Sequence, residues 1–144
     1  SLIDSEGKHN YRYTIIGRRD RLPETMIAKI EELESTTKNE KGMQVILCID
    51  YGGRDELLRA VNKAIKDGKE VDEESFADYL DTNNFPDPEL VIRTGGEQRL
   101  SGFMPFQTVY SEFIFSDVLF PDFAEEHLEE AITEYKNRKR RFGS

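Results

Sequence analysis

One loop carries more chemistry than any other part of the chain, the segment RTGGEQRLS over residues 93–101. It directly follows the apolar run Leu90–Ile92, which has the length and composition of a short buried strand. Arginine holds phosphate oxygens with two parallel hydrogen bonds, and a glycine pair lets the backbone approach a ligand closely. The loop therefore predicts a diphosphate site, with Arg93 and Arg99 as its main cations and with Ser101 and backbone amides as further donors.

Two alternatives stay open for charged residues in and near this loop. Arg99 can instead form a surface salt bridge with Glu97, which would contribute little if it is exposed. Glu112 lies between Tyr110 and Phe113 on an element expected to be partly buried, so its carboxylate needs a partner. That partner is either a divalent cation, which is often held by one or two carboxylates plus substrate phosphate, or an arginine. Spacing alone does not decide between the two.

Short apolar runs alternate with segments of helical periodicity along most of the chain. This alternation predicts an α/β fold: a mainly parallel sheet with right-handed crossovers and helices on both faces. We expect a single domain over 1–144, with 1–10 as a frayed and disordered start. The expected strands are 11–16, 45–49, 89–92 and 113–115. Helices are expected to begin at Pro23, near Asp55 and at Asp72, and a short one over 103–110. A further helix at the end of the chain is expected to be capped by Asp122, with Glu125 as its capping-box partner.

Arginines gather in the loops that follow three predicted strands, at Gly17–Arg21, Asp50–Arg54 and Arg93–Ser101. In an open parallel sheet, ligands bind outside the carboxyl ends of the strands, and all three loops would lie at that edge. A solvated basic rim explains any one of the loops taken alone. All three together favour a bound group with several negative charges. The six arginines concerned are Arg18, Arg19, Arg21, Arg54, Arg93 and Arg99.

Composition excludes several classes of function. The formal net charge of −9 argues against a general nucleic-acid binder, because a polyanion would be repelled. The longest apolar runs are too short to span a bilayer. Cys48 is the only cysteine, and its place in an apolar run predicts a small core residue in a reducing cytosol. His9 and His127 have no ligand spacing to a second histidine or cysteine, so no zinc site is expected.

Several motifs, in order, resemble those of the cis-prenyltransferases, the undecaprenyl and related polyprenyl diphosphate synthases. They are Asp50–Arg54, Leu90–Ser101, Ser111–Glu112, Asp117–Phe123 and Arg141–Gly143. The likeness runs from about Tyr11 to Gly143. It implies an enzyme that adds isopentenyl diphosphate repeatedly to an allylic diphosphate, forms cis double bonds, and requires Mg²⁺.

The resemblance also implies roles for individual residues. Arg93, Arg99, Leu100 and Ser101 would bind isopentenyl diphosphate, and Glu112 would be the metal-associated carboxylate. Support for the diphosphate loop would come from Gly95, Gly96, Arg54, Arg141 and Gly143. The last two match a C-terminal motif that reaches the active site of the partner subunit in a homodimer. The full-length protein would work in the cytoplasm, with a place at the membrane face because its product is a lipid.

One family segment is absent from these 144 residues: the Asp-Gly-Asn-Gly-Arg-Trp type motif with the catalytic aspartate. We therefore expect the chain to be the C-terminal part of a longer synthase, to contain no catalytic residue of its own, and to be inactive alone. Asp50 replaces the usual Asn, and Gln98 replaces a commoner His. The alternative is a non-catalytic accessory subunit of a heteromeric prenyltransferase. A nucleotide-binding domain is disfavoured because no Walker-type Gly-Lys-Ser/Thr loop is present.

Overall fold

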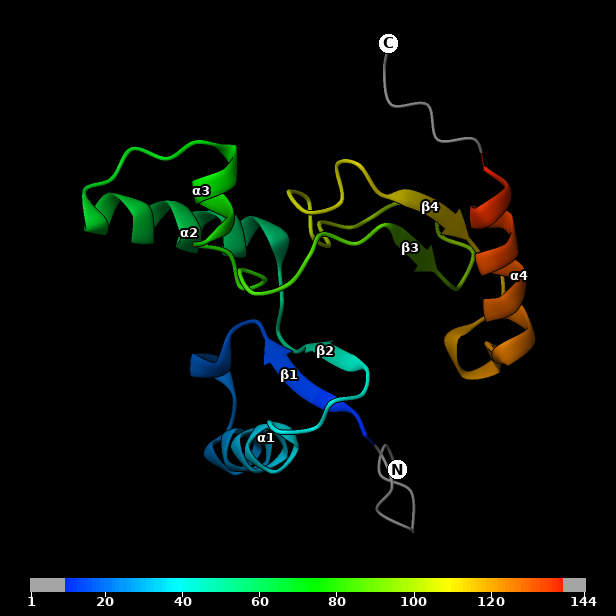
Figure 1. Ribbon diagram of the computed structural model, residues 1–144, viewed down its shortest axis with the longest axis horizontal. Helices are drawn as coiled ribbons and strands as arrows, with labels where there is room; N and C mark the ends of the chain where they lie inside the picture. The colour runs from blue at the N-terminus through cyan, green and yellow to red at the C-terminus, as the bar shows by residue number, and fades with distance from the viewer. Residues whose placement is uncertain (1–9, 139–144) are drawn as a thin grey trace. The chain divides into compact units, whose positions relative to one another are not determined.

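The computed structural model describes residues 10–138, and contacts divide the chain into two compact units, 1–84 and 85–144. Both contain a pair of parallel strands accompanied by helices, so the predicted α/β class is confirmed (Figure 1). Among the described residues the strands form two separate two-stranded sheets, whereas the sequence suggested one narrow sheet of four strands.

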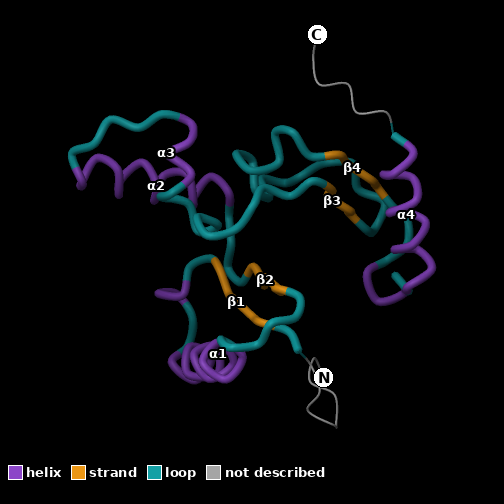
Figure 2. Tube along the Cα trace, viewed as in Figure 1, coloured by secondary structure: helices purple, strands orange, loops and turns teal. Residues whose placement is uncertain are grey.

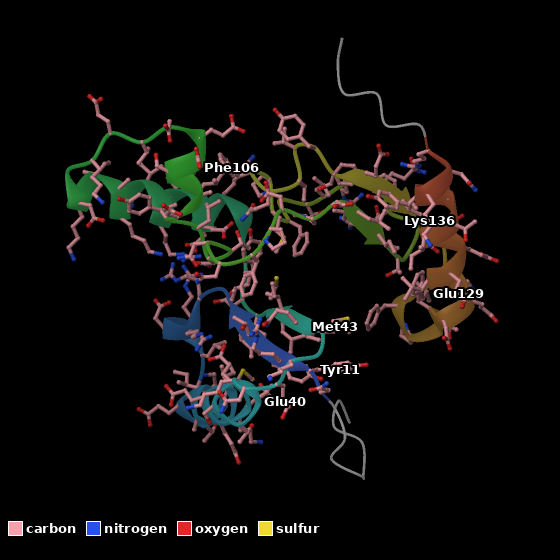
Figure 3. The ribbon with its side chains drawn as sticks, viewed as in Figure 1. Tyr11, Glu40, Met43, Phe106, Glu129 and Lys136 are labelled. Atoms are coloured by element: carbon pink, nitrogen blue, oxygen red, sulfur yellow. The ribbon has the colours of Figure 1, made fainter. Side chains whose placement is uncertain are left out.

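The first sheet consists of β1 (Arg12–Ile16) and β2 (Gln44–Cys48), paired in parallel from Arg12 opposite Gln44 to Ile16 opposite Cys48. Figure 3 labels Tyr11 and Met43, which precede the two strands and mark their neighbouring amino ends. A short 3₁₀ turn, η1 (Arg19–Arg21), and the helix α1 (Glu24–Thr37) form the crossover between them. Parallel strands need such a crossover, so the local pattern and the sheet agree.

Side chains of α1 accept hydrogen bonds from the backbone at the free edge of β1. The Tyr13 N–H donates to Thr37 Oγ1 at 3.2 Å, and the Ile15 N–H donates to Glu34 Oε1 at 2.8 Å. Partial burial alone would raise the pKa of Glu34, but hydrogen bonds from Arg19 and from the Ile15 amide lower it. The edge amides are thereby satisfied without another strand.

Two further helices complete the first unit, α2 (Gly53–Asp67) and α3 (Glu73–Ala77), which lie beside each other in Figure 1. Gly68 ends α2 in the left-handed conformation with φ 64°, which glycine adopts at helix ends without a steric penalty. Asp72 caps α3 by accepting the Ser75 N–H at 2.9 Å. The buried apolar side chains here are Ala60, Ala64 and Leu80, and Glu56 is buried with them.

The second unit contains β3 (Leu90–Arg93) and β4 (Glu112–Phe115), paired in parallel with Leu90 opposite Glu112 and Arg93 opposite Phe115. A second 3₁₀ turn, η2 (Phe120–Asp122), leads to α4 (Glu125–Asn137). Ile114 of β4 and Ala131 of α4 are buried. In Figure 2 a long loop, without a helix, joins β3 to β4.

The predicted helix over 103–110 is therefore wrong. Gly102 and Met104 have left-handed backbones, with φ 78° and 45°, and Pro105 follows them. One helical turn survives, in which the Thr108 N–H donates to the Met104 carbonyl at 3.0 Å. Left-handed backbone positions at Gly102 and Met104 interrupt a regular helix at the start of this segment.

The predicted cap of the last helix is also wrong. Asp122 belongs to η2, and α4 begins after Ala124. His127 supplies the cap, because its Nδ1 accepts the Ala124 N–H at 3.0 Å. In a capping box, the side chain three residues after the N-cap accepts a hydrogen bond from the N-cap N–H, and His127 has that role here. Sequence analysis had given His127 no role.

Burial of β2 differs from the prediction. The run 45–49 suggested a strand buried on both faces, but Val45 to Leu47 are half-buried and Cys48 is exposed. The prediction that Cys48 is a core residue is therefore wrong. Among the described residues β2 pairs only with β1, and α1 contacts mainly β1, so α1 leaves the second strand partly exposed.

Candidate functional site

The loop after β3 is tied down by its glycines. Gly95 and Gly96 have φ of 89° and 76°, a backbone that other residues rarely adopt. Their N–H groups donate to the carbonyls of Val118 at 2.8 Å and Ser116 at 3.0 Å. These amides were expected as donors to a diphosphate, but they already have partners after β4. The glycines thus shape the loop, and side chains must supply the ligand contacts.

Arg93, the last residue of β3, places its guanidinium under this loop. Its Nη1 donates to the Arg99 carbonyl and to Ser101 Oγ, the latter at 3.2 Å. Within residues 10–138, Arg93 forms no salt bridge. The guanidinium is therefore held by neutral oxygens, and no carboxylate among these residues compensates its charge, which suits an anionic ligand.

A cavity of about 270 Å³ opens beside this guanidinium. Its walls are mainly apolar and come from the end of β3 and from the loop after it. The lining residues are Val91, Ile92, Arg93, Thr94, Leu100 and Phe103. A small ligand with a hydrocarbon part and an anionic part fits such a lining, because the apolar part leaves water while the charge stays at the arginine.

Arg99 is arranged differently from Arg93. Its guanidinium forms an ion pair with Glu97, and the two side chains are 64% and 46% exposed. Of the two readings that the sequence left open for Arg99, the structure contains the surface salt bridge. Such an exposed pair is weak, so Arg99 can readily leave Glu97 for another anion. The structure brings together the Arg93 guanidinium, the Ser101 hydroxyl and the Arg99 backbone carbonyl.

Glu112 lies at the other end of the strand pair. It is opposite Leu90, whereas Arg93 is opposite Phe115, three residues further along the sheet, or about 10 Å. Arg138 donates to Glu112 Oε2 at 2.9 Å, so the arginine partner is the one present. Among residues 10–138 no three His, Cys, Asp or Glu residues are grouped to hold a metal ion. Glu112 therefore offers a single carboxylate, which would need phosphate and water oxygens to complete a magnesium site.

In the first unit, the loop Gly17–Arg21 uses its arginines internally. Arg18 donates to both oxygens of Asp20, at 2.8 and 2.7 Å, and to Asp55 at 2.7 Å. The hydrogen bonds from Arg18 hold the pKa of Asp20 down at about 2. Arg19 pairs with Glu34 at 2.5 Å and with the Ile15 carbonyl at 2.6 Å. These guanidinium groups are already neutralised, which weakens the interpretation of this loop as an anion site.

Sequence analysis did not identify the carboxylates that compensate arginine charges in this unit, chiefly Asp55 and Asp81. Arg59 makes two 2.6 Å hydrogen bonds to Asp81 and one of 2.8 Å to Asp55. The hydrogen bond from Arg59 is the main cause that lowers the pKa of Asp55. For Asp55, the sequence showed only an acidic residue in the first turn of a helix, and such residues usually interact with the helix dipole.

Glu56 is also in the first turn of α2, and it is 1% exposed. It accepts hydrogen bonds from the Tyr51 hydroxyl at 2.5 Å and from the Asp81 N–H at 2.9 Å. It thus joins the loop Asp50–Arg54 to the turn after α3. Arg54 itself is exposed and forms no salt bridge among the described residues. Arg141 and Gly143, named as loop support, lie outside the described residues.

Comparison with known proteins places the chain. Residues 2–143 match the family model described as putative undecaprenyl diphosphate synthase. The isoprenyl transferase of Fusobacterium nucleatum is 47% identical over 137 residues, which cover 94% of this chain and 59% of that protein. The isoprenyl transferase of Aquifex aeolicus is 46% identical over 133 residues, with 92% and 58% covered. The chain thus spans somewhat under two thirds of the length of these relatives.

Solved structures agree with the sequence matches. Lavandulyl diphosphate synthase from Lavandula x intermedia, solved in complex with dimethylallyl diphosphate, superposes with a TM-score of 0.88 at 39% identity. That match covers 93% of this chain and 61% of the other. A probable undecaprenyl diphosphate synthase from Campylobacter jejuni gives 0.86 at 35% identity, with 97% and 66% covered. The chain therefore belongs to the undecaprenyl diphosphate synthase family of prenyltransferases.

Proposed function

We propose that this chain carries the isopentenyl diphosphate half-site of a cis-prenyltransferase. In the full reaction, the alkene of isopentenyl diphosphate would form a carbon–carbon bond to the first carbon of an allylic diphosphate. The carbon–oxygen bond of that allylic partner would break, releasing diphosphate, and a proton would be lost to restore a double bond. Repetition would build a cis-polyprenyl diphosphate.

One observation carries this proposal: the uncompensated Arg93 guanidinium beside an apolar cavity. The diphosphate would take the guanidinium together with Ser101 Oγ. The short hydrocarbon would lie against Leu100 and the end of β3. Arg99 would join after its weak pair with Glu97 opens. A positioned alkene lowers the barrier because the reacting carbons no longer have to find each other in solution.

Magnesium belongs to the proposal through Glu112. When bound, the ion would offset the negative charge that develops on the departing diphosphate. Glu112 would supply one carboxylate for the ion, and residues 10–138 contain no group of three His, Cys, Asp or Glu that could complete the site.

The proposal extends to partners and place of action. We expect a homodimer of the full-length protein, which would act in the cytoplasm with peripheral contact to a membrane through its lipid product. Within residues 10–138 no helix is long and apolar enough to cross a bilayer. The lipid chemistry of the product is what supports the membrane contact.

Calorimetric titration of isopentenyl diphosphate into the chain tests the half-site. Arg93→Ala should weaken binding about 10- to 100-fold, since a charge-assisted hydrogen bond contributes about 1.5–3 kcal/mol. Arg12→Ala is the matched control, because it removes an exposed arginine of β1 whose side chain hydrogen-bonds only Gln44 among the described residues. Equal affinity in the Arg93 variant and the wild type would refute the site.

A turnover assay tests the enzyme itself. The 144-residue chain with Mg²⁺ and both diphosphates should form no polyprenyl product, because the family's catalytic-aspartate motif is not among its residues. Product formed by this chain alone would contradict the half-site description. If the chain fails to bind isopentenyl diphosphate but raises the activity of a separate catalytic chain, the accessory-subunit alternative replaces the proposal.

A further inference from the structure

A tight turn over residues 100–103 forms one side of the cavity beside Arg93. Its central residues, Ser101 and Gly102, have φ of 51° and 78°. The Phe103 N–H donates to the Leu100 carbonyl at 3.0 Å and closes the turn. Two left-handed central residues with this hydrogen bond are the pattern of a type I′ turn, in which the first and the last residue lie close together.

This turn presents groups for both parts of an alkyl diphosphate within four residues. At its first central position, the Ser101 hydroxyl accepts a hydrogen bond from the Arg93 guanidinium at 3.2 Å. At its two ends, the side chains of Leu100 and Phe103 line the cavity opposite residues of β3. Phe103 is the largest apolar side chain of this lining and is 39% exposed, so its ring borders both the cavity and the solvent.

The cavity has room for a short hydrocarbon only. Its volume of about 270 Å³ is below the range of about 300–1,000 Å³ that is typical of pockets for drug-sized ligands. In a filled apolar pocket, one methylene group more or less changes binding by about 10- to 200-fold. A longer chain must either displace the Phe103 ring or leave its additional carbons in water.

We infer that Phe103, held in place by the turn 100–103, is a specificity-determining residue: its ring limits the hydrocarbon of a bound diphosphate to the size of one isopentenyl unit. The inference rests on the proposed function, because it takes the diphosphate to be held at Arg93 and Ser101. It adds the residue that selects the short chain.

Calorimetric titration of the 144-residue chain with three probes tests this limit. The probes are inorganic diphosphate, isopentenyl diphosphate and citronellyl diphosphate, a ten-carbon isoprenoid diphosphate that is not allylic. The wild type should bind isopentenyl diphosphate at least about tenfold more tightly than citronellyl diphosphate. Phe103→Ala should remove this preference, because it weakens isopentenyl diphosphate binding about three- to tenfold and makes room for the longer chain. Inorganic diphosphate has no hydrocarbon and should bind both proteins equally.

Phe120→Ala is the matched control, because it removes the same ring from a residue that is 80% exposed and is not part of the cavity lining. Its preference for the short chain should equal that of the wild type. Phe103→Leu keeps a smaller apolar side chain and should keep part of the preference. The inference is overturned if Phe103→Ala retains the wild-type preference, or if Phe120→Ala loses as much of it.

A change at Gly102 tests whether the turn holds the ring. A Cβ at this position would meet no atom within 4 Å, so Gly102→Ala alters only the backbone preference. Because alanine disfavours a left-handed backbone, this variant should lose at least about threefold of the preference for isopentenyl diphosphate. Gly102→Asn should keep it, since asparagine tolerates this conformation. Loss in both variants, or in neither, would contradict a ring positioned by the turn.

The half-site and the specificity role of Phe103 fail in different ways. If isopentenyl diphosphate binding depends on Arg93 but Phe103→Ala leaves the preference unchanged, only the role of Phe103 is wrong. If the wild type binds neither inorganic diphosphate nor isopentenyl diphosphate, the half-site is wrong and the role of Phe103 is wrong with it.

Discussion

Two arginine-bearing loops, one in each unit, show opposite use of the same side chain. After β1, Arg18 is bound on three sides by the carboxylates of Asp20 and Asp55. After β3, Arg93 is held by a carbonyl and a hydroxyl and has no carboxylate partner among the described residues. Both loops follow a parallel strand and contain glycine and arginine, so the sequence presents them as equivalent. The difference teaches that an arginine indicates an anion site only where its charge is left uncompensated.

The largest expected effect comes from giving Arg93 the kind of partner that Arg18 has. Ser101→Asp would place a carboxylate at the oxygen that Arg93 already contacts, and aspartate tolerates the φ of 51° found there. Isopentenyl diphosphate binding should weaken about 100-fold in calorimetry, as in a loss of the guanidinium itself. Ser101→Ala is the control and should lose only severalfold. Similar affinities of the two variants would show that a carboxylate beside Arg93 does not prevent diphosphate binding, which would contradict the contrast between the two loops.

A smaller effect is expected where arginine and carboxylate stabilise the first unit. Arg59→Ala leaves Asp81, whose side chain is 12% exposed, without its two 2.6 Å hydrogen bonds. The free energy of unfolding, measured by amide exchange in α2, should fall by about 1–3 kcal/mol. Arg54→Ala removes an exposed arginine of the same helix and should change it by less than about 0.5 kcal/mol. If both variants are equally stable, the ion pairs of Arg59 do not contribute measurably to the free energy of unfolding.

Acid should weaken the same unit in a defined range. The pKa of Asp20 is about 2 in the folded chain against an ordinary value of 3.8, and the pKa of Asp55 is also lowered. Stability from these depressed carboxyl groups is present above pH 4 and is lost as the pH falls toward 2. A carbon-13 titration of the Asp20 carboxyl should show the low value, and Arg18→Gln should return it to the ordinary range. An unchanged titration in that variant would remove Arg18 as the cause.

The smallest effect concerns the exposed pair of Arg99 and Glu97. Glu97→Gln frees the Arg99 guanidinium for a ligand, so diphosphate binding should tighten by at most about fivefold, or 1 kcal/mol. Glu129→Gln, an exposed position on α4 labelled in Figure 3, gives the same change of net charge and should have no effect. Weaker binding in the Glu97 variant would mean that this carboxylate positions Arg99 for the ligand.

Several local features followed from the sequence because their causes are local. The apolar runs of β1 and β3, the glycine stop of α2 and the Asp72 cap of α3 depend on neighbours within a few residues. The motif order that implied the family was equally readable, and the family is confirmed. The helix over 103–110 failed because left-handed positions at Gly102 and Met104 depend on the loop around them.

The sequence by itself determined the alternation of strands and helices, the loop that follows β3 and the family to which the chain belongs. Only the tertiary structure decided which charges remain available. Arg18 and Asp55 are 37 residues apart, Arg59 and Asp81 are 22 apart, and Arg138 and Glu112 are 26 apart. Electrostatic interaction depends on distance in space and on burial, and neither can be read from positions along the chain.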